Sequence, residues 1–164
     1  KGEIVIQPGD YDAGEMDKFN GLLALKDNST DKWGIFDVST GKQVVSFKYD
    51  SISFAGTDRL VVVKDHVKNL INMSTGKSLY SAQTEATIEP FNSDTVTWVH
   101  TGKDAYTIID NDGHVLFRDT NNIIEDVKSF NHGFSSVKSK GKWGVMNAKG
   151  EWVVQPTYEA VNIL

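Results

Sequence analysis

The sequence predicts an all-β fold of tandem repeats of about 37 residues, each folding into three to four short antiparallel strands. One observation is a series of regularly spaced glycines: Gly2, Gly41, Gly76, Gly113 and Gly150. A second is that apolar runs such as residues 60–63 have the length of strands and are rich in β-branched residues. A third is that no window has a convincing helical period, so at most one helical turn is expected, at residues 10–19.

The strands of each repeat are predicted in chain order from the runs around the turn glycine. A first strand precedes a polar loop, at residues 22–26, 60–64, 95–100 and 134–138. A second strand covers residues 33–37 and their equivalents in the other copies. A third follows the turn glycine, at residues 44–45, 79–80, 115–117 and 152–154, with an additional N-terminal copy at 4–6. A short fourth segment, such as residues 51–54, completes the repeat.

A tight turn joins the second and third strands, and its residue types predict its conformation. It begins with an Asp or Asn whose side chain can bind the backbone two residues on, and it ends with a glycine that adopts positive φ. Residues 110–113, Asp-Asn-Asp-Gly, also resemble the start of a calcium-binding loop, but the glutamate that such a loop needs is replaced by Asp119. Because residues 147–150 fill the same slot in another repeat, we interpret this segment as a hairpin turn.

The repeats are predicted to form one domain over residues 1–164. It comprises a half repeat at 1–18 and complete repeats at about 19–54, 55–90, 91–129 and 130–164. A single repeat cannot bury its own apolar face, so neighbouring repeats must stack, either as an open superhelical array, which we favour, or as a small propeller-like ring. The chain begins at Lys1 and shows no signal peptide, so we expect it to be part of a longer protein.

Composition argues against several partners and sites. The net charge is −5 and the basic residues are scattered, which argues against nucleic acid, and no apolar stretch is long enough for membrane insertion. There is no cysteine, which excludes thiolate metal sites and a cysteine nucleophile. The histidines lack metal-ligand spacing, and phosphate-binding and nucleophile motifs are absent. We therefore expect no metal, no cofactor and no enzyme activity.

Residues 140–159 carry Lys142-Trp143-Gly144, a turn ending in Gly150, an apolar strand, and Pro156 before Tyr158-Glu159. This pattern resembles the WG-repeat family of bacterial proteins. Residues 32–50 are similar to it as well, and residues 2–12 resemble the second half of another copy, whereas the remaining repeats replace Trp-Gly by Lys68-Asn69 and Tyr106-Thr107. The resemblance implies repeat-mediated binding, often on surface or multidomain proteins, and implies no catalytic residues.

The tryptophans are the candidate contact residues. Trp33 and Trp143 hold matching positions, and we predict that each packs between repeats with its indole N–H bonded to a backbone carbonyl. The glycine after each one would permit close approach of a neighbouring strand. Trp98 and Trp152 stand where other copies hold aliphatic residues. One of these two is predicted to be exposed and to contact a ligand or partner.

Acidic residues recur near the end of the repeat: Asp12, Asp50, Glu85 and Glu159. A glycosidase would need two carboxylates at a set separation, whereas recurrence once per repeat favours a structural role. We predict that each caps a turn or accepts backbone N–H bonds, for example from the neighbouring repeat.

The sequence therefore favours a non-catalytic binding module for a protein or carbohydrate partner. The loops at residues 28–31, 65–67 and 101–104 vary most between repeats and are predicted contact surfaces. The alternative is a structural spacer or stalk of a bacterial surface protein, which would have no concave pocket and no exposed aromatic residues. A cell-surface or secreted location is favoured over the cytoplasm.

Overall fold

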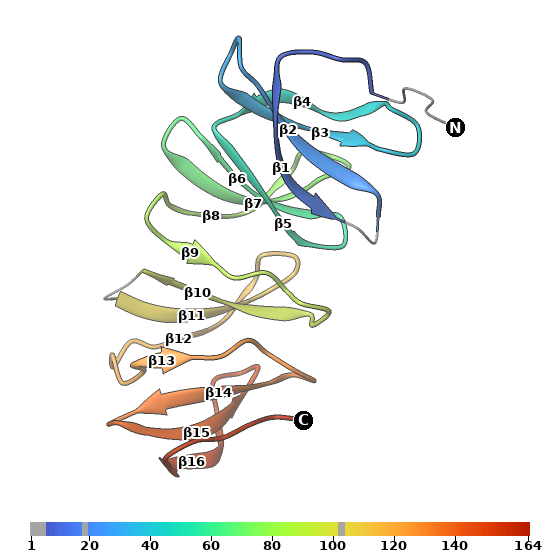
Figure 1. Ribbon diagram of the computed structural model, residues 1–164. Helices are drawn as coiled ribbons and strands as arrows, with labels where there is room; N and C mark the ends of the chain where they lie inside the picture. The colour runs from blue at the N-terminus through green and yellow to red at the C-terminus, as the bar shows by residue number, and fades with distance from the viewer. Residues whose placement is uncertain (1–5, 18–19, 102–103) are drawn as a thin grey trace. The chain divides into compact units, whose positions relative to one another are not determined.

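The computed structural model describes residues 6–17, 20–101 and 104–164 (Figure 1). Most of the predicted strand copy at 4–6, the glycine Gly2 and part of the predicted contact loop at 101–104 lie outside these residues. The chain divides into two compact units. The first comprises residues up to Phe54 together with Asp58–Thr84, and the second comprises Ala55–Thr57 and Glu85–Leu164.

The predicted all-β fold is confirmed, since the described residues form four antiparallel sheets of four strands each. The first sheet contains β1 (Tyr11–Asp17), β2 (Leu22–Asp27), β3 (Lys32–Asp37) and β4 (Gln43–Tyr49). The second contains β5 (Ser51–Gly56), β6 (Arg59–Lys64), β7 (Val67–Asn72) and β8 (Ser78–Gln83). The third contains β9 (Thr87–Ile88), β10 (Val96–Thr101), β11 (Asp104–Asp110) and β12 (Val115–Arg118). The fourth contains β13 (Asp126–Val127), β14 (Phe134–Ser139), β15 (Lys142–Asn147) and β16 (Trp152–Tyr158).

Two features of the strand order differ from the repeat as read in the sequence. The segment for which at most one helical turn was expected is strand β1, which pairs with β2 and bulges between Ala13 and Met16. That bulge interrupts the alternation by which a strand is recognised in a sequence. In addition, the segment after Tyr49-Asp50 is the first strand of the following sheet, because β5 pairs with β6. The sheets are thus offset from the sequence repeats by a few residues.

Each compact unit has its own apolar core. In the first unit, Ile35, Val45 and Tyr49 of the first sheet pack with Leu60 and Ile71 of the second. In the second unit, the core is formed by buried residues of the third and fourth sheets and of the segments on either side of β13: Val96, Trp98, Ile108, Ile124, Phe130, Val137 and Met146. One sheet therefore covers the apolar face of another, as the stacking argument predicts.

In each sheet, the turn between the third and fourth strands has the side-chain hydrogen bond and the glycine conformation that the sequence predicts. The side chains of Asp37, Asn72, Asp110 and Asn147 each accept a backbone N–H from two or three residues further on. The glycines that close these turns have φ between 72° and 84°. The Asp110 turn holds its carboxylate with the N–H groups of Asp112 and His114, so the interpretation of the calcium-like segment as a hairpin turn is confirmed.

The Trp-Gly pair marks a bulge in the strand beside it. Trp33 faces Tyr49 and Ile35 faces Val45, so β4 holds extra residues between these two pairs. The same irregularity separates β15 and β16 opposite Gly144. A β-carbon on Gly34 would lie 2.6 Å from the Val45 carbonyl oxygen, and one on Gly144 would lie 2.4 Å from that of Val154. The prediction that these glycines permit close approach of a neighbouring strand is confirmed.

Candidate functional site

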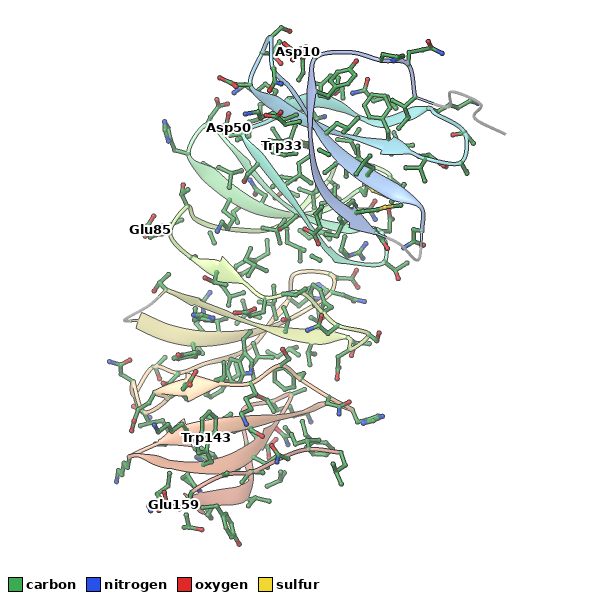
Figure 2. The ribbon with its side chains drawn as sticks, in the orientation of Figure 1. Asp10, Trp33, Asp50, Glu85, Trp143 and Glu159 are labelled. Atoms are coloured by element: carbon green, nitrogen blue, oxygen red, sulfur yellow. The ribbon has the colours of Figure 1, made fainter. Side chains whose placement is uncertain are left out.

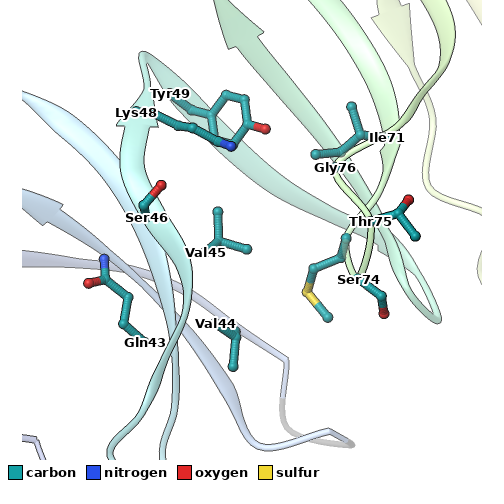
Figure 3. Close-up of a pocket in the computed structure, with 11 residues that line it drawn as sticks. Gln43, Val44, Val45, Ser46, Lys48, Tyr49, Ile71, Ser74, Thr75 and Gly76 are labelled. Carbon is teal, nitrogen blue, oxygen red and sulfur yellow. The ribbon is translucent and has the colours of Figure 1, made fainter.

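A recess lies between the bulged strand β4 and the turn that follows β7, both within the first compact unit (Figure 3). We call it the β4 recess. Its volume is about 420 Å³, within the range of small-molecule and peptide side-chain pockets. One wall comes from β4: Gln43, Val44, Val45, Ser46, Lys48 and Tyr49. The other wall comes from the end of β7 and the turn after it: Ile71, Met73, Ser74, Thr75 and Gly76.

The recess combines an apolar floor with a polar rim. Val45, Tyr49 and Ile71 are buried, since they belong to the core of the first unit. Val44 stands at the rim with 46% of its surface exposed. Met73 and Gly76 also line the recess, and the other lining residues carry hydroxyl, amide and ammonium groups. A bound group could therefore bury an apolar part and make hydrogen bonds at its edge.

Hydrogen bonds hold the turn side of the recess in place. The Asp58 carboxylate accepts the backbone N–H of Ser74 at 2.9 Å and its hydroxyl at 2.6 Å. The Asn72 side chain accepts the N–H of Thr75 at 3.0 Å, and the Asn72 carbonyl accepts that of Gly76 at 2.8 Å. These bonds order the turn before any ligand arrives, which lowers the entropy cost of binding.

On the strand side, Lys48 is the charged group of the recess. Its ammonium nitrogen lies 5.3 Å from the centre of the Tyr49 ring, a cation–π distance. Lys48 lies within the bulged part of β4, opposite the interval between Trp33 and Ile35. The Trp-Gly pair, which permits the bulge, therefore also helps to place this lysine.

Of the recurring acids, Asp50 has the structural role predicted for it. The Asp50 carboxylate contacts the ammonium group of Lys32 and accepts the backbone N–H of Asp65, in the hairpin turn of the second sheet, at 3.2 Å. These contacts hold the pKa of Asp50 below its usual value, the bond from Lys32 being the largest cause. Asp50 thus joins the first sheet to the second, as the prediction of a bond to a neighbouring repeat requires.

Asp12 and Glu159 contact side chains, and backbone N–H bonds to Asp12, Glu85 and Glu159 stay predictions. Asp12 lies 3.7 Å from the Lys26 ammonium group and accepts the Asn28 side-chain amide at 3.4 Å. Glu159 binds Lys142, the counterpart of Lys32, and this contact lowers the pKa of Glu159. Glu85 is exposed.

One acid of this kind escaped the sequence reasoning. Glu125 accepts the backbone N–H of Gly141 at 2.9 Å, in the hairpin turn of the fourth sheet. It does there what Asp50 does for the second sheet. Glu125 lies twelve positions after the turn glycine Gly113, whereas Asp50 follows Gly41 after nine. No tyrosine precedes Glu125, so neither the spacing nor the Tyr-Asp motif identified it as one of the recurring acids.

The prediction for Trp98 needs correction, because its side chain is only 1% exposed. Its indole N–H donates to the Ser135 hydroxyl at 2.9 Å, and its ring packs edge-on against Tyr106 and stacks on Phe130. A residue so enclosed cannot offer a contact surface. The sequence showed that Trp98 broke the repeat pattern, but not that residues from other strands enclose it.

The other candidate, Trp152, is partly buried and packs against the core of the second unit. The residues after it in β16 are more open, with Val153 51% and Tyr158 54% exposed. A ligand contact by Trp152 stays a prediction.

Trp33 and Trp143, the tryptophans of the two Trp-Gly pairs, lie in the first and the fourth sheet (Figure 2). Trp33 packs against the core shared by the first and second sheets, as predicted, and its ring also covers Gly14 of β1, where a β-carbon would lie 2.5 Å away. The ring of Trp143 lies under the Lys128 ammonium group, 5.2 Å from the ring centre. The predicted bonds from their indole N–H groups to backbone carbonyls stay predictions.

Among the described residues, no group of three or more His, Asp or Glu side chains is arranged to hold a metal ion. In the same part of the chain, no helix has the length and hydropathy needed to cross a bilayer.

Comparison with known proteins agrees with the repeat pattern. The family model described as "WG containing repeat" matches residues 33–65 and 143–162, the two segments that begin at Trp-Gly. The resemblance drawn from those residues is therefore confirmed. A comparison with curated proteins finds no match.

Solved structures are similar in fold at low identity. A crystal structure of the eukaryotic initiation factor is 11% identical, with a TM-score of 0.64 over 94% of this chain and 46% of that one. Kluyveromyces lactis Hsv2 with loop 6CD replaced by a Gly-Ser linker is 8% identical, with a TM-score of 0.51 over 85% of this chain and 52% of that one. This chain therefore spans about half the length of these two structures, and the likeness concerns the fold alone.

Proposed function

We propose that this chain, with its WG repeats, is a non-catalytic interaction module that binds an extended segment of a protein partner in the β4 recess. The observation that carries the proposal is the recess itself, which has an apolar floor, a hydrogen-bonding rim and a turn already held in position. The alternative function, a spacer or stalk without a ligand, would have no concave pocket, so the recess favours binding.

The lining favours a protein segment over a carbohydrate. Sugars commonly stack on an open aromatic face, but Tyr49 is only 7% exposed and Lys48 lies over its ring. An extended peptide fits better, with an apolar side chain against Val44 and Met73 and a carboxylate toward Lys48. A charge-assisted hydrogen bond from an ammonium group to a carboxylate is stronger than one between neutral groups.

The same lining supports the non-catalytic part of the proposal. Its titratable groups are the Lys48 ammonium and the Tyr49 phenol, without a carboxylate, histidine or thiol among the lining residues. General acid–base catalysis near neutral pH commonly relies on histidine or carboxyl groups, and nucleophilic catalysis needs a group with a base beside it. The lining residues of the recess can therefore bind a ligand, but they do not include a nucleophile with a base beside it.

The proposal is tested with two probe panels added to the isotope-labelled protein. One contains synthetic peptides with a carboxylate beside an apolar residue, and the other contains neutral and acidic oligosaccharides. We expect the peptides to shift the backbone NMR signals of Val44, Lys48 and Met73. Lys48→Glu should abolish those shifts, whereas Lys149→Glu, an exposed lysine in a turn of the fourth sheet, should preserve them.

Shifts caused only by oligosaccharides, or shifts confined to other surfaces, would overturn the assignment of the recess to a protein partner. Peptide binding that Lys48→Glu leaves unchanged would also overturn it. Silence across both panels would remove the recess as a binding site and restore the spacer as the better explanation.

A further inference from the structure

The edge strands of the sheets differ in how well they are protected against pairing with another strand. An edge strand presents unpaired backbone groups, and proteins discourage pairing there with bulges, charges, proline or very short strands. Among the strands that close each sheet after the tight turn, β4 is bulged and carries Lys48, while β16 is bulged and carries Pro156. Strand β12 has only four residues and ends in Arg118.

The opposite edges are protected as well. Strand β1 is bulged and carries Asp12, Glu15 and Asp17. The Glu15 carboxylate accepts the backbone N–H of Phe54 at 3.3 Å, and the Ala55 carbonyl accepts that of Phe91 at 2.8 Å, so backbone groups of β5 are occupied at two positions. Strands β9 and β13 have two residues each.

Strand β8 has none of these protections over most of its length. It reads Ser-Leu-Tyr-Ser-Ala-Gln, without charge or proline. Its pairing with β7 is regular from Tyr80 to Gln83, and the one irregularity lies before Tyr80. Ser78, Ser81 and Gln83 are exposed. Among the edges of the described residues, β8 is therefore the one most open to a further strand.

Charges at the two ends of β8 indicate which strand fits. Lys77 immediately precedes β8, and Glu85 follows two residues after its end; both are exposed. If a second β8 runs antiparallel to the first about a two-fold axis at Ser81, Lys77 of each copy lies opposite Glu85 of the other. A parallel arrangement would bring like charges together. Opposite charges across a strand pair stabilise it and like charges destabilise it.

The register also satisfies the geometry of antiparallel pairing. Directly opposite residues alternate between hydrogen-bonded and non-hydrogen-bonded pairs. A two-fold axis must therefore pass through a pair of identical residues, as an axis at Ser81 does. The uncharged residues from Ser78 to Thr84 would then face each other, and the ion pairs would lie at the two ends.

We propose that β8 is a self-association edge, through which two copies of this chain pair antiparallel into a continuous eight-stranded sheet. This surface is separate from the β4 recess, so the proposal does not depend on the function assigned to that recess. Two-fold homodimers are the commonest symmetric assembly. In their interfaces the same surface of both copies is used, so that if one residue contacts a second residue of the partner, the second also contacts the first of the partner.

Sedimentation and hydrogen exchange test the pairing on the intact chain. We expect a monomer–dimer equilibrium in sedimentation, and amide exchange that slows with protein concentration between Tyr80 and Gln83. Exchange along β4 and β16 should not depend on concentration. A chain that stays monomeric up to millimolar concentration, or a dimer that leaves the β8 amides unprotected, would overturn the proposal.

Charge variants at the axis provide a second test. Ser81→Lys and Ser81→Glu each place two like charges side by side, so each alone should weaken dimerisation by about fivefold or more. Mixing the two variants should restore a dimer containing one copy of each. Ser81 is exposed and Ser78 also donates to Asn69, so both variants should keep the monomer fold.

Ser81→Ala and Gln155→Lys are the matched controls. The first keeps the edge uncharged, and the second adds a lysine to the edge strand β16, so both should dimerise like the parent chain. A dimer that persists unchanged in Ser81→Lys and Ser81→Glu would show that another surface associates, and so would a mixture that fails to form the mixed dimer.

Discussion

Each compact unit contains one sheet with a Trp-Gly pair in its third strand and one sheet without it. In the first and fourth sheets, Gly34 and Gly144 lie under a bulged outer strand. In the second and third sheets, Asn69 and Thr107 hold this position, and each pairs regularly, with Ser81 and Arg118 respectively. The strands and turns persist in all four sheets, so the motif is not needed for the strand order. The motif changes the outer strand of the sheet, which is bulged where Trp-Gly is present.

That difference has consequences for both proposed surfaces. Where glycine permits the bulge, the outer strand is protected against pairing and, in β4, it presents Lys48 to a recess. Where a side chain fills the glycine position, the outer strand pairs regularly opposite that residue, and in β8 it is left open. The Asn69 side chain also accepts bonds from the hydroxyls of Ser78 and Ser81, which fixes the β8 edge to its neighbour.

The largest expected effect is the loss of stability on removing Trp98, which is buried, compared with removing Trp143, which is partly exposed. Trp98→Ala should lower the free energy of unfolding by about 4 kcal/mol, because it removes a buried ring from the core. Trp143→Ala should cost no more than about 2 kcal/mol, since that ring is partly exposed. Urea unfolding followed by circular dichroism measures both, and equal losses would contradict the contrast between the two sheets.

The second prediction tests the glycine directly. Gly144→Ala should lower the free energy of unfolding by about 2 kcal/mol, because its β-carbon would meet backbone atoms of Val154, Gln155 and Pro156 within 2.8 Å. Thr107→Ala, at the equivalent position of the third sheet, should cost less, since a β-carbon is already present there. If both cost the same, the glycine would not be required by the bulge.

The sequence predicted what depends on neighbouring residues in the chain. The Asp37 turn could be predicted because an Asp side chain and a glycine four residues later determine it locally. The glycine of Trp-Gly could be assigned to close packing because it has no side chain to clash. The stacking of sheets followed from the size of a single repeat.

What could not be predicted depends on residues from different sheets. Burial of Trp98 requires Ser135 and Phe130, which approach it only in the folded unit. The β4 recess joins Lys48 of one sheet to Ser74 of the next, and no spacing in the sequence relates them. Strand β1 was missed because its bulge hides the alternation.

A third and smaller effect is expected at the contact between the first two sheets. Asp50→Ala should lower the Tm by less than Gly144→Ala does, because it removes a bond to the Asp65 N–H and an ion pair with Lys32 at an exposed site. Differential scanning calorimetry measures the shift. Glu151→Ala, an exposed acid in the turn of the fourth sheet, is the control and should leave the Tm almost unchanged. An unchanged Tm in Asp50→Ala would remove the structural role assigned to this acid.

The smallest expected effect is a difference in the pH dependence of stability between turns that begin with Asp and turns that begin with Asn. The Asp37 carboxylate accepts the hydroxyl and the N–H of Ser39, and these bonds lower the pKa of Asp37 from its usual value of 3.8. A lowered folded-state pKa adds stability above the unfolded-state pKa, and that stability is lost as the pH falls through the folded-state value. Asn72 and Asn147 make similar turns and cannot titrate in this range.

Asp37→Asn should therefore leave the stability at pH 7 nearly unchanged and reduce the loss of stability on acidification below about pH 4. Urea unfolding at pH 7 and pH 3 measures the difference, and Asn147→Asp should show the reverse change. If the parent chain and Asp37→Asn lose equal stability between these pH values, the carboxylate adds nothing that the amide lacks. The two turn types would then be interchangeable, and the acid sensitivity of the fold would reside in contacts such as Asp50 with Lys32.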